Sequence, residues 1–569
     1  MPALRHAPIS RPLLATLFVA LLGAGFRAPG VARAAEPEVI AVVAVDGYAD
    51  LKKQVRWIGT LVGNPALDGF AESFIMMATQ FKGLAGLDVD RPAGLVVTAD
   101  DGVPAVNGFV PVKDLSKLLA ALAGVVGPAE KADGGWQLAP PGGMPLQVVE
   151  KDGWAIFSPA GGSSPLADPS AALAPLVKSF TLAAEFFPSR MPEGLRELLK
   201  KGIQQAADAA AAQGQQIDRG MLVAALDNLK TTESLALGFN IDMDKKRVYV
   251  ESRTVMLPGS MAAELWDGIG KAESTVGAGP AGDGKPLAVR GHHAQAVPDA
   301  VRAALELGLT QAMPDADADP LAKASFGIVR DLLAAMLDAG GIDAGVSIDT
   351  SGSTDDRPLP AFTIGMRVKD GTALEASLKE RLGKAGDLPP GVKVAFDSGK
   401  EGAANLHTIT VDLAGLPNAE KLGGAVELTL AVTPTYAFLI SGDDVPKRVA
   451  AALTASGKPN AAVKPLTGID LSLPALLGYA AKMAKIFSPG DPQNEQLAAV
   501  AQIAGDKADA LVQLLVRPIE RGVAIRLSAD AGVVETIATG VAPQPGPAGL
   551  PGAGGLPLQP GVPLPGLAP

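Results

Sequence analysis

Residues Ser234–Ser252 read SLALGFNIDMDKKRVYVES, and Ala510–Ser528 read ALVQLLVRPIERGVAIRLS. In each stretch apolar side chains alternate with polar ones on both sides of a short charged turn, which is the pattern of a β-hairpin. Hairpins connect antiparallel neighbours, so both stretches predict a mainly antiparallel sheet rather than a doubly wound parallel one. Shorter runs such as Val426–Val432 are predicted strands of the same kind.

Amphipathic helices are predicted between these strands. Residues 195–212 place leucine and isoleucine at helical spacing ahead of an Ala-rich run, and residues 297–313 and 327–337 follow the same period. Such helices lay one apolar face on a core. The predicted fold class is therefore α+β, with amphipathic helices packed on a mainly antiparallel sheet.

A weak internal repeat runs through the chain. When the sequence is shifted by 256 positions, Pro104–Leu122 aligns with Pro360–Leu378, and eight of the nineteen residues are identical. The two hairpins quoted above close each half in the same order. We therefore predict a tandem duplication, with one unit over residues 39–275, a second over 285–541, and a Gly-rich linker at 276–284.

The first 34 residues have the three-part order of a secretory signal peptide. Arg5 and Arg11 precede an uncharged run over residues 12–26, and Ala32-Arg33-Ala34 offers small residues for cleavage. The apolar run is shorter than the roughly 20 residues that a bilayer span needs. These features predict an exported protein, periplasmic or extracellular, without a transmembrane segment in the mature chain. The chain contains no cysteine, which excludes a lipid-modified cysteine and disulfides.

Composition limits the classes of partner. The signal peptide holds four arginines and no acidic residue, so the mature chain carries 45 basic and 60 acidic side chains, a net charge of −15. Without a cluster of lysine and arginine, this balance argues against nucleic-acid binding. Residues 542–569 are almost entirely Pro, Gly, Leu and Ala. That composition predicts a disordered tail, with a spacer or a docking segment for a Pro-binding partner as the alternatives.

Two phosphate-binding sequence motifs occur in the linker, and each lacks a flanking feature that phosphate binding requires. Gly277 to Gly282 reads GxGxxG, but the motif follows a predicted helix rather than a strand and contains Pro280. Gly279 to Lys285 reads GxxxxGK, but Pro286 stands where a P-loop needs Ser or Thr. A flexible joint is the better interpretation of this segment.

Metal-binding patterns are equally incomplete. Asp315, Asp317 and Asp319 resemble the start of a calcium loop, but Pro320 and Phe326 replace its Gly and its bidentate Glu. A solvated acidic loop is the better interpretation, and weak calcium binding the alternative. The mature chain has three histidines, namely His292, His293 and His407. The first two point to opposite faces of a strand, and His407 is predicted to be a satisfied structural residue, with a meeting of His407 and His293 across the units as the alternative.

The repeat preserves one polar pair, Lys113-Asp114 and Lys369-Asp370. Each pair stands where a predicted strand gives way to a helix, so the aspartates are predicted to cap helices, and a functional pair is the alternative. The nucleophile and zinc motifs GxSxG, SxxK and HExxH are absent from the sequence. We therefore assign no catalytic, cofactor-binding or metal-binding residue and no cofactor, and regard enzymatic activity as unassigned.

Three short stretches carry a resemblance. Lys82 to Asp88 (KGLAGLD), Arg91 to Gly94 (RPAG) and Phe109 to Leu115 (FVPVKDL) follow one another in an order that resembles a group of large exported bacterial proteins of unknown function. The resemblance covers about residues 39–157. It implies a secreted, repeated α+β body and no particular activity.

These observations favour an exported, non-catalytic binding protein or envelope-associated structural protein. The first alternative is a carrier of an apolar, lipid-like ligand, because paired α+β units can enclose a cavity of several hundred Å³. The second alternative is a carboxylate-dependent hydrolase, for which the sequence offers no residue. The partner is an unassigned envelope protein or apolar ligand.

Overall fold

The computed structural model describes residues 38–541, except for 101–102, 140–144, 160–167, 213–228, 278–286, 312–319, 356, 384–387, 389–390, 415–418, 458–465, 506 and 508–509. The predicted signal peptide, the C-terminal segment 542–569 and most of the predicted linker lie outside the described residues.

A single antiparallel sheet of 20 strands forms the framework of the described chain. The strands are β1 (Glu38–Val45), β2 (Ala93–Asp100), β3 (Val103–Pro111), β4 (Ala129–Ala132), β5 (Gly135–Leu138), β6 (Leu146–Lys151), β7 (Trp154–Pro159), β8 (Leu182–Phe186), β9 (Thr232–Asp242), β10 (Arg247–Met256), β11 (Val289–Ala296), β12 (Gly341–Asp349), β13 (Ala361–Arg367), β14 (Val392–Glu401), β15 (Ala404–Asp412), β16 (Ala425–Val432), β17 (Tyr436–Ser441), β18 (Thr467–Ser472), β19 (Leu511–Ile519) and β20 (Gly522–Asp530).

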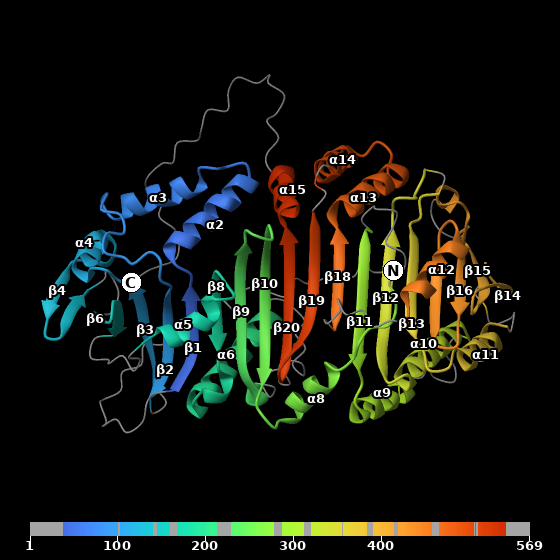
Figure 1. Cartoon of the computed structure of the whole chain (residues 1–569), viewed down its shortest axis with the longest axis horizontal. Coiled ribbons are helices and arrows are strands. Elements are labelled where there is room, and N and C mark those ends of the chain that lie inside the picture. The colour runs from blue at the N-terminus through green and yellow to red at the C-terminus, as the bar shows by residue number, and fades with distance from the viewer. Residues whose placement is uncertain are drawn as a thin grey trace, which may run out of the picture.

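The hydrogen-bonded pairs place these strands in one continuous row. From one edge to the other the row reads β4-β5-β6-β7-β3-β2-β1-β8-β9-β10-β20-β19-β18-β11-β12-β13-β17-β16-β15-β14. Figure 1 shows red β20 and β19 lying between green β10 and orange β18. The predicted antiparallel sheet is confirmed, and the two predicted hairpins are β9–β10 and β19–β20.

The pairing of β10 with β20 joins the two halves of the chain. It runs from Arg247 opposite Asp530 to Val255 opposite Gly522 without a break in register. Residues about 280 positions apart therefore lie side by side at the centre of the sheet. The closing hairpins of the two halves were expected, but their pairing with each other was not.

Thirteen α-helices accompany the sheet in the described residues, so the α+β class is confirmed. They are α2 (Tyr48–Leu61), α3 (Leu67–Ala78), α4 (Leu115–Val126), α5 (Ser170–Val177), α6 (Glu193–Ala212), α8 (Met261–Ile269), α9 (Asp299–Gln311), α10 (Pro320–Asp338), α11 (Gly371–Leu382), α12 (Val445–Ala455), α13 (Leu473–Phe487), α14 (Pro492–Gly505) and α15 (Ala531–Val541). Helices α6, α9 and α10 are the amphipathic helices that the sequence predicts. Within the described residues, no helix has both the length and the hydropathy of a membrane span.

The core lies under helices that cover parts of the sheet. Helix α5 packs on β1, β2 and β8, where Phe109, Trp154 and Leu173 are buried together. Helix α12 packs on β13, β14 and β17 over Phe438 and Ile440. Trp154 of β7 is 2% exposed. Figure 1 shows the central strands running between these two helices.

Candidate functional site at the centre of the sheet

A buried carboxylate lies in the middle of the central strand pair. Glu251 of β10 is directly opposite Arg526 of β20, and its side chain is 0% exposed. An ionised carboxylate that is removed from water needs charged or hydrogen-bonding partners, because desolvation otherwise costs several kcal/mol. The neighbours of Glu251 therefore decide what this position does.

Three guanidinium groups surround this carboxylate. Arg253 Nε donates to Glu251 Oε1 over 2.7 Å. Arg526 Nε donates to Oε2 over 2.6 Å, and Arg517 Nη2 donates to the same oxygen over 2.8 Å. We call Arg253, Arg517 and Arg526 the arginine cluster. Its members come from three adjacent strands, β10, β19 and β20.

Strand alternation places these side chains on one face of the sheet. Side chains two residues apart in a strand share a face, so Glu251 and Arg253 do so in β10. Arg526 joins them because it lies opposite Glu251. Arg517 lies opposite Ala524, which is two residues before Arg526 in β20, and therefore shares this face.

Aromatic rings hold two of the guanidinium groups in place. Arg526 lies 4.1 Å from the ring centroid of Tyr249, and Arg253 lies 4.8 Å from that of Phe180. The two rings contact each other edge to face, with centroids 6.4 Å apart. Phe180 reaches this place because it packs over Gly238, where an added Cβ would be 2.3 Å from the ring. Stacking on a ring restrains a guanidinium and leaves the donors on its edge free.

The cluster has more positive charge and more donors than Glu251 satisfies. Three arginines against one carboxylate leave a formal surplus of two positive charges. In the described part of the chain Glu251 is the one hydrogen-bond acceptor of these arginines, although each guanidinium carries five N–H donors. The Nε of Arg517 is buried without a partner. The three side chains are 24–39% exposed, so solutes reach them.

The cluster also fixes the ionisation of Glu251. Burial alone would raise the pKa of Glu251, but hydrogen bonds from Arg253 and Arg526 outweigh burial and hold the pKa below its ordinary value of 4.5. Glu251 is therefore a carboxylate at neutral pH and acts as a fixed internal anion.

The reverse face of the same strands is apolar and exposed. Val250 lies opposite Phe239 of β9 and Leu527 of β20, and Phe239 lies opposite Leu182 of β8. We call the following six side chains, each 36–53% exposed, the apolar patch: Leu182, Leu237, Phe239, Val250, Ile525 and Leu527. A continuous apolar patch on a protein surface marks a place of interaction.

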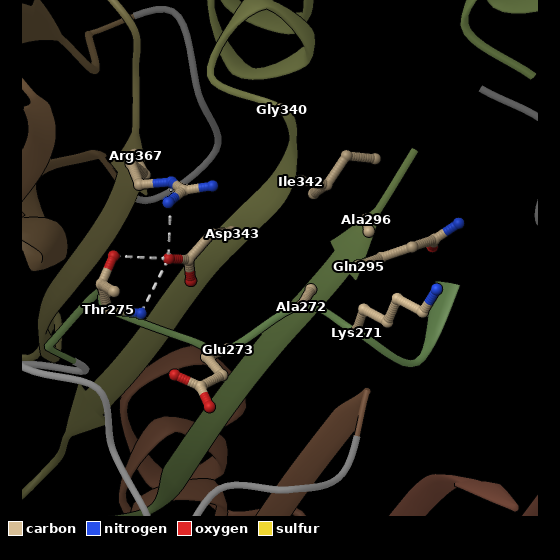
Figure 2. A pocket seen from close by; sticks show the side chains of 10 residues that line it. All are labelled: Lys271, Ala272, Glu273, Thr275, Gln295, Ala296, Gly340, Ile342, Asp343 and Arg367. Atoms are coloured by element: carbon tan, nitrogen blue, oxygen red, sulfur yellow. Dashed lines mark hydrogen bonds and ion pairs between the residues drawn. The ribbon is translucent and has the colours of Figure 1, made fainter. Parts of the chain in front are cut away.

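A pocket of about 370 Å³ lies between the segment that follows α8 and residues of β11, β12 and β13 (Figure 2). Its charged side chains are Lys271, Glu273, Asp343 and Arg367. Asp343 is 2% exposed and accepts hydrogen bonds from the Ser274 hydroxyl over 2.9 Å and from the Thr275 amide and hydroxyl, each over 2.8 Å. These bonds occupy the carboxylate, so Asp343 anchors the segment after α8 to β12.

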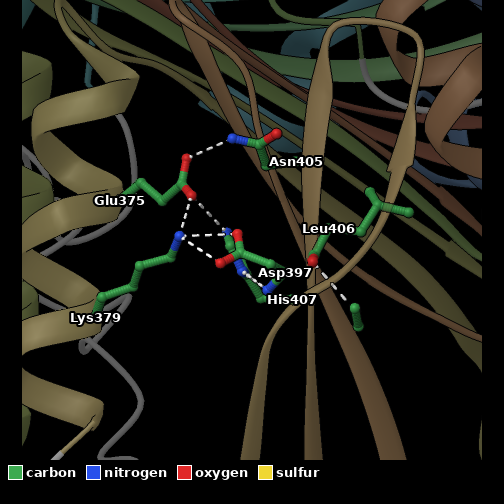
Figure 3. A network of polar contacts seen from close by, with 7 residues as sticks. Glu375, Lys379, Asp397, Asn405, Leu406 and His407 are labelled. Atoms are coloured by element: carbon green, nitrogen blue, oxygen red, sulfur yellow. Dashed lines mark hydrogen bonds and ion pairs between the residues drawn. The ribbon is translucent and has the colours of Figure 1, made fainter.

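A second polar network lies beside α11 (Figure 3). Glu375 accepts hydrogen bonds from Lys379 over 2.7 Å and from Asn405 over 2.9 Å. Lys379 also contacts Asp397 over 2.8 Å, and the Nε2 of His407 lies 3.4 Å from Glu375. Burial lowers the pKa of His407 below its ordinary value of 6.5, although the Glu375 carboxylate opposes that shift. His407 is therefore neutral at pH 7.

The ring of His407 is oriented against metal binding. Glu375, Asp397 and His407 bring three potential ligand atoms within 4.8 Å of one another. However, the backbone N–H of Asp397 donates to Nδ1 of His407 over 3.0 Å, so a neutral ring carries its proton on Nε2. Neither nitrogen then offers a free lone pair, and the Lys379 ammonium already bridges both carboxylates. We interpret the network as structural, but the predicted satisfaction of His407 is met only at Nδ1, because its Nε2 is buried without a hydrogen-bond partner.

The other two histidines, His292 and His293, are neighbours in β11 and so point to opposite faces of the sheet, as predicted. His292 packs over Gly468, and its Nε2 is buried without a partner. His293 bonds the hydroxyl of Thr467 over 2.8 Å and lies 3.2 Å from the side chain of Gln295. His293 and His407 belong to separate hydrogen-bonded groups, so the alternative meeting of these residues is not supported.

Asp114 and Asp370, which occupy matching positions in the internal repeat, cap helices as predicted. Asp114 accepts a hydrogen bond from the amide of Lys117 at the start of α4, and Asp370 accepts one from Ala373 at the start of α11, each over 3.0 Å. In the linker, the amide of Gly277 donates to Ser456 Oγ over 2.9 Å. The remaining residues of the GxGxxG and GxxxxGK motifs lie outside the described residues. The same holds for Asp315, Asp317 and Asp319.

Comparison with protein-family models, with curated proteins and with solved structures found no match to this chain. The site therefore has to be interpreted from its own geometry. Sequence reasoning missed the arginine cluster, although a signal was present: Glu251 and Arg253 interrupt one apolar-alternating strand, and Arg517 and Arg526 interrupt the corresponding hairpin. Charged side chains that interrupt the apolar alternation of both hairpins indicate that the two hairpins contact each other through these side chains.

Replacing the internal anion tests the electrostatics of the cluster. We expect Glu251→Gln to lower the free energy of unfolding at pH 7 by about 3–5 kcal/mol, because three cations then surround an uncharged side chain. Since the folded-state pKa of Glu251 is depressed, its contribution is complete above pH 4.5 and is lost as the pH falls through the folded value. Urea unfolding at several pH values measures both effects, and the deficit should shrink on acidification.

The matched control is Glu520→Gln in the exposed β19–β20 turn, where the side chain is 89% exposed. It should change stability by less than about 0.5 kcal/mol. A Glu251→Gln protein as stable as the parent at pH 7 would contradict the electrostatic account, as would a deficit that stays constant on acidification.

His407→Asn tests the second network, because the amide oxygen can still accept the Asp397 N–H bond. A lowered folded-state pKa means that the unfolded chain takes up the proton first, so His407 destabilises the parent as the pH falls below 6.5. We expect the variant to lose less stability than the parent between pH 7 and pH 5, measured by urea unfolding. Equal pH slopes for the two proteins would show that His407 is not the titrating group.

Proposed function

We propose that this chain is an exported, non-catalytic binding protein that holds an anionic ligand at the arginine cluster. The observation that carries the proposal is the surplus of guanidinium donors over acceptors around Glu251. If the arginines served the buried carboxylate alone, one bidentate partner would neutralise it. Instead, three arginines converge on one carboxylate, and each of their side chains is partly exposed to solvent.

The chemistry of the cluster favours oxyanions. Guanidinium groups match carboxylate, phosphate and sulfate oxygens with paired, charge-assisted hydrogen bonds. Their surplus of two positive charges fits a dianion such as phosphate or a molecule with two carboxylates. Stacking of Arg526 on Tyr249 and of Arg253 on Phe180 reduces the entropy lost on binding, since these side chains are ordered beforehand.

We further propose that the chain consists of two tandem similar units. In the row of strands, β1 to β10 follow the order β4-β5-β6-β7-β3-β2-β1-β8-β9-β10, and β11 to β20 repeat that order with ten added to each number. The match of Pro104–Leu122 with Pro360–Leu378 supports the same division. On this view β10 and β20 are corresponding strands, and the arginine cluster is shared between the units.

A carrier of an apolar ligand is the second candidate, and the apolar patch is the observation that favours it. The patch and the arginine cluster lie on opposite faces of one sheet, so they would serve different ligands. Native mass spectrometry of protein purified from its own envelope separates the two candidates, because a co-purifying lipid would favour the carrier. The hydrolase alternative gains no support, since the buried carboxylates described above are each occupied by hydrogen-bond donors.

Calorimetric titration with inorganic phosphate tests the anion site. We expect Arg517→Gln to weaken phosphate binding by about 10- to 100-fold, which corresponds to one lost charge-assisted hydrogen bond. Glu251 keeps Arg253 and Arg526 in this variant, so its charge stays balanced. Sulfate and a dicarboxylate in the same titration define the ligand class.

Arg247→Gln is the matched control. Arg247 lies on the same face of β10 but is paired one to one with Asp530, over 2.6 Å. Its removal should leave phosphate affinity unchanged. An equal loss of phosphate affinity in Arg517→Gln and Arg247→Gln would show that affinity depends only on net charge. If phosphate, sulfate and the dicarboxylate all fail to bind the parent protein, the proposal is overturned.

A further inference from the structure

Helix α3 turns large apolar side chains toward solvent. Phe70, Phe74 and Met77 are 74%, 62% and 66% exposed. Their spacing of four and three residues places them on one side of the helix. Phe81, which is 79% exposed, follows directly after the helix. We call these four side chains the α3 stripe.

The conformation after α3 keeps Phe81 at the surface. Gln80 and Phe81 both have left-handed backbone angles, with φ of 52° and 67°, which residues with a Cβ adopt at a cost. The amide of Phe81 donates to the carbonyl of Met76, which holds this turn on the end of the helix. An exposed phenylalanine in a strained turn gains nothing from water, so the stripe is suited to a partner that covers it.

The charges around the stripe favour an uncharged partner. On the neighbouring helix α2, Lys52 pairs with Glu72 over 2.8 Å, and Arg56 pairs with Asp68 over 2.7 Å. Lys82 donates to the carbonyl of Ala120 over 3.0 Å. These basic groups already have partners, so the stripe lacks the basic border that attracts anionic lipid.

The C-terminal segment 542–569 has a composition suited to the α3 stripe, and it begins close to that stripe in the fold. It contains no charged residue and alternates proline and glycine with leucine, as in Leu556-Pro-Leu-Gln-Pro560. Proline-rich segments bind aromatic surfaces at a small entropic cost. The segment begins where α15 ends, α15 contacts α2, and α2 packs against α3. At roughly 3.1 Å per residue, its 28 residues reach on the order of 80 Å.

We propose that the α3 stripe is the docking surface for this chain's own C-terminal segment, residues 542–569. The leucine and proline side chains of the segment cover Phe70, Phe74, Met77 and Phe81. This interaction is independent of the anion site, since it uses neither the central strands nor a charged group.

The absence of cysteine allows a direct test of coverage in the full chain. Met77→Cys introduces a single thiol within the stripe, and Leu307→Cys introduces a control thiol on α9, where the native side chain is 59% exposed. We expect the thiol at position 77 to react with a maleimide at least tenfold more slowly than the control. Deleting residues 542–569 should raise the rate at position 77 toward the control and leave the rate at position 307 unchanged.

Three outcomes would overturn the proposal. The first is an equal rate at position 77 with and without the C-terminal segment. The second is protection that survives the deletion and rises with protein concentration, which would assign the stripe to a second copy of the chain. The third is protection that requires neutral phosphatidylcholine vesicles, which would assign it to a lipid surface. Unfolding midpoints of all the variants, compared with the parent, verify that each rate reports on a folded protein.

Discussion

The antiparallel pairing of β10 with β20 is the constraint on which the rest of the structure depends. Nine residue pairs join strands that are nearly 280 positions apart in the chain. Without this pairing each half of the sheet would expose a long central edge, which is a template for association with other chains. With it, the edges of the sheet are the distant strands β4 and β14. The same pairing brings Glu251 and Arg526 together, so the fold and the candidate site have one origin.

Local sequence patterns account for much of the fold. Alternation in residues 234–252 and 510–528 predicts the hairpins β9–β10 and β19–β20, because each strand presents one face to a core. Asp114 and Asp370 mark the starts of α4 and α11 through their capping bonds. The order of hairpins in the sheet has no such local signal. Strands β10 and β20 add the ion pairs Glu251–Arg526 and Arg247–Asp530 to their backbone bonds, but the partners lie far apart in the chain and no local pattern links them.

The candidate site was less predictable than the fold for a related reason. Sequence motifs detect residues at fixed spacing along the chain, whereas Arg253, Arg517 and Arg526 come from strands brought together by tertiary pairing. Their ring partners add a further step, because Phe180 meets Arg253 only through its contact with Gly238. The histidines, which sequence analysis could list, fall instead in local structural roles: His293 bonds Thr467, and His407 accepts the Asp397 amide.

Comparison of three buried carboxylates shows how the proposed anion site differs from two structural networks. Asp343 accepts bonds from Ser274 and Thr275, and its charge is balanced by a single ion-pair partner, Arg367. Glu375 shares its one close cation, Lys379, with Asp397, so this network has no surplus of positive charge. Glu251 differs because its donors exceed what one carboxylate accepts, and the excess is partly exposed to solvent. In the proposed function, an anion that enters there would meet donors that Glu251 and the aromatic rings already position.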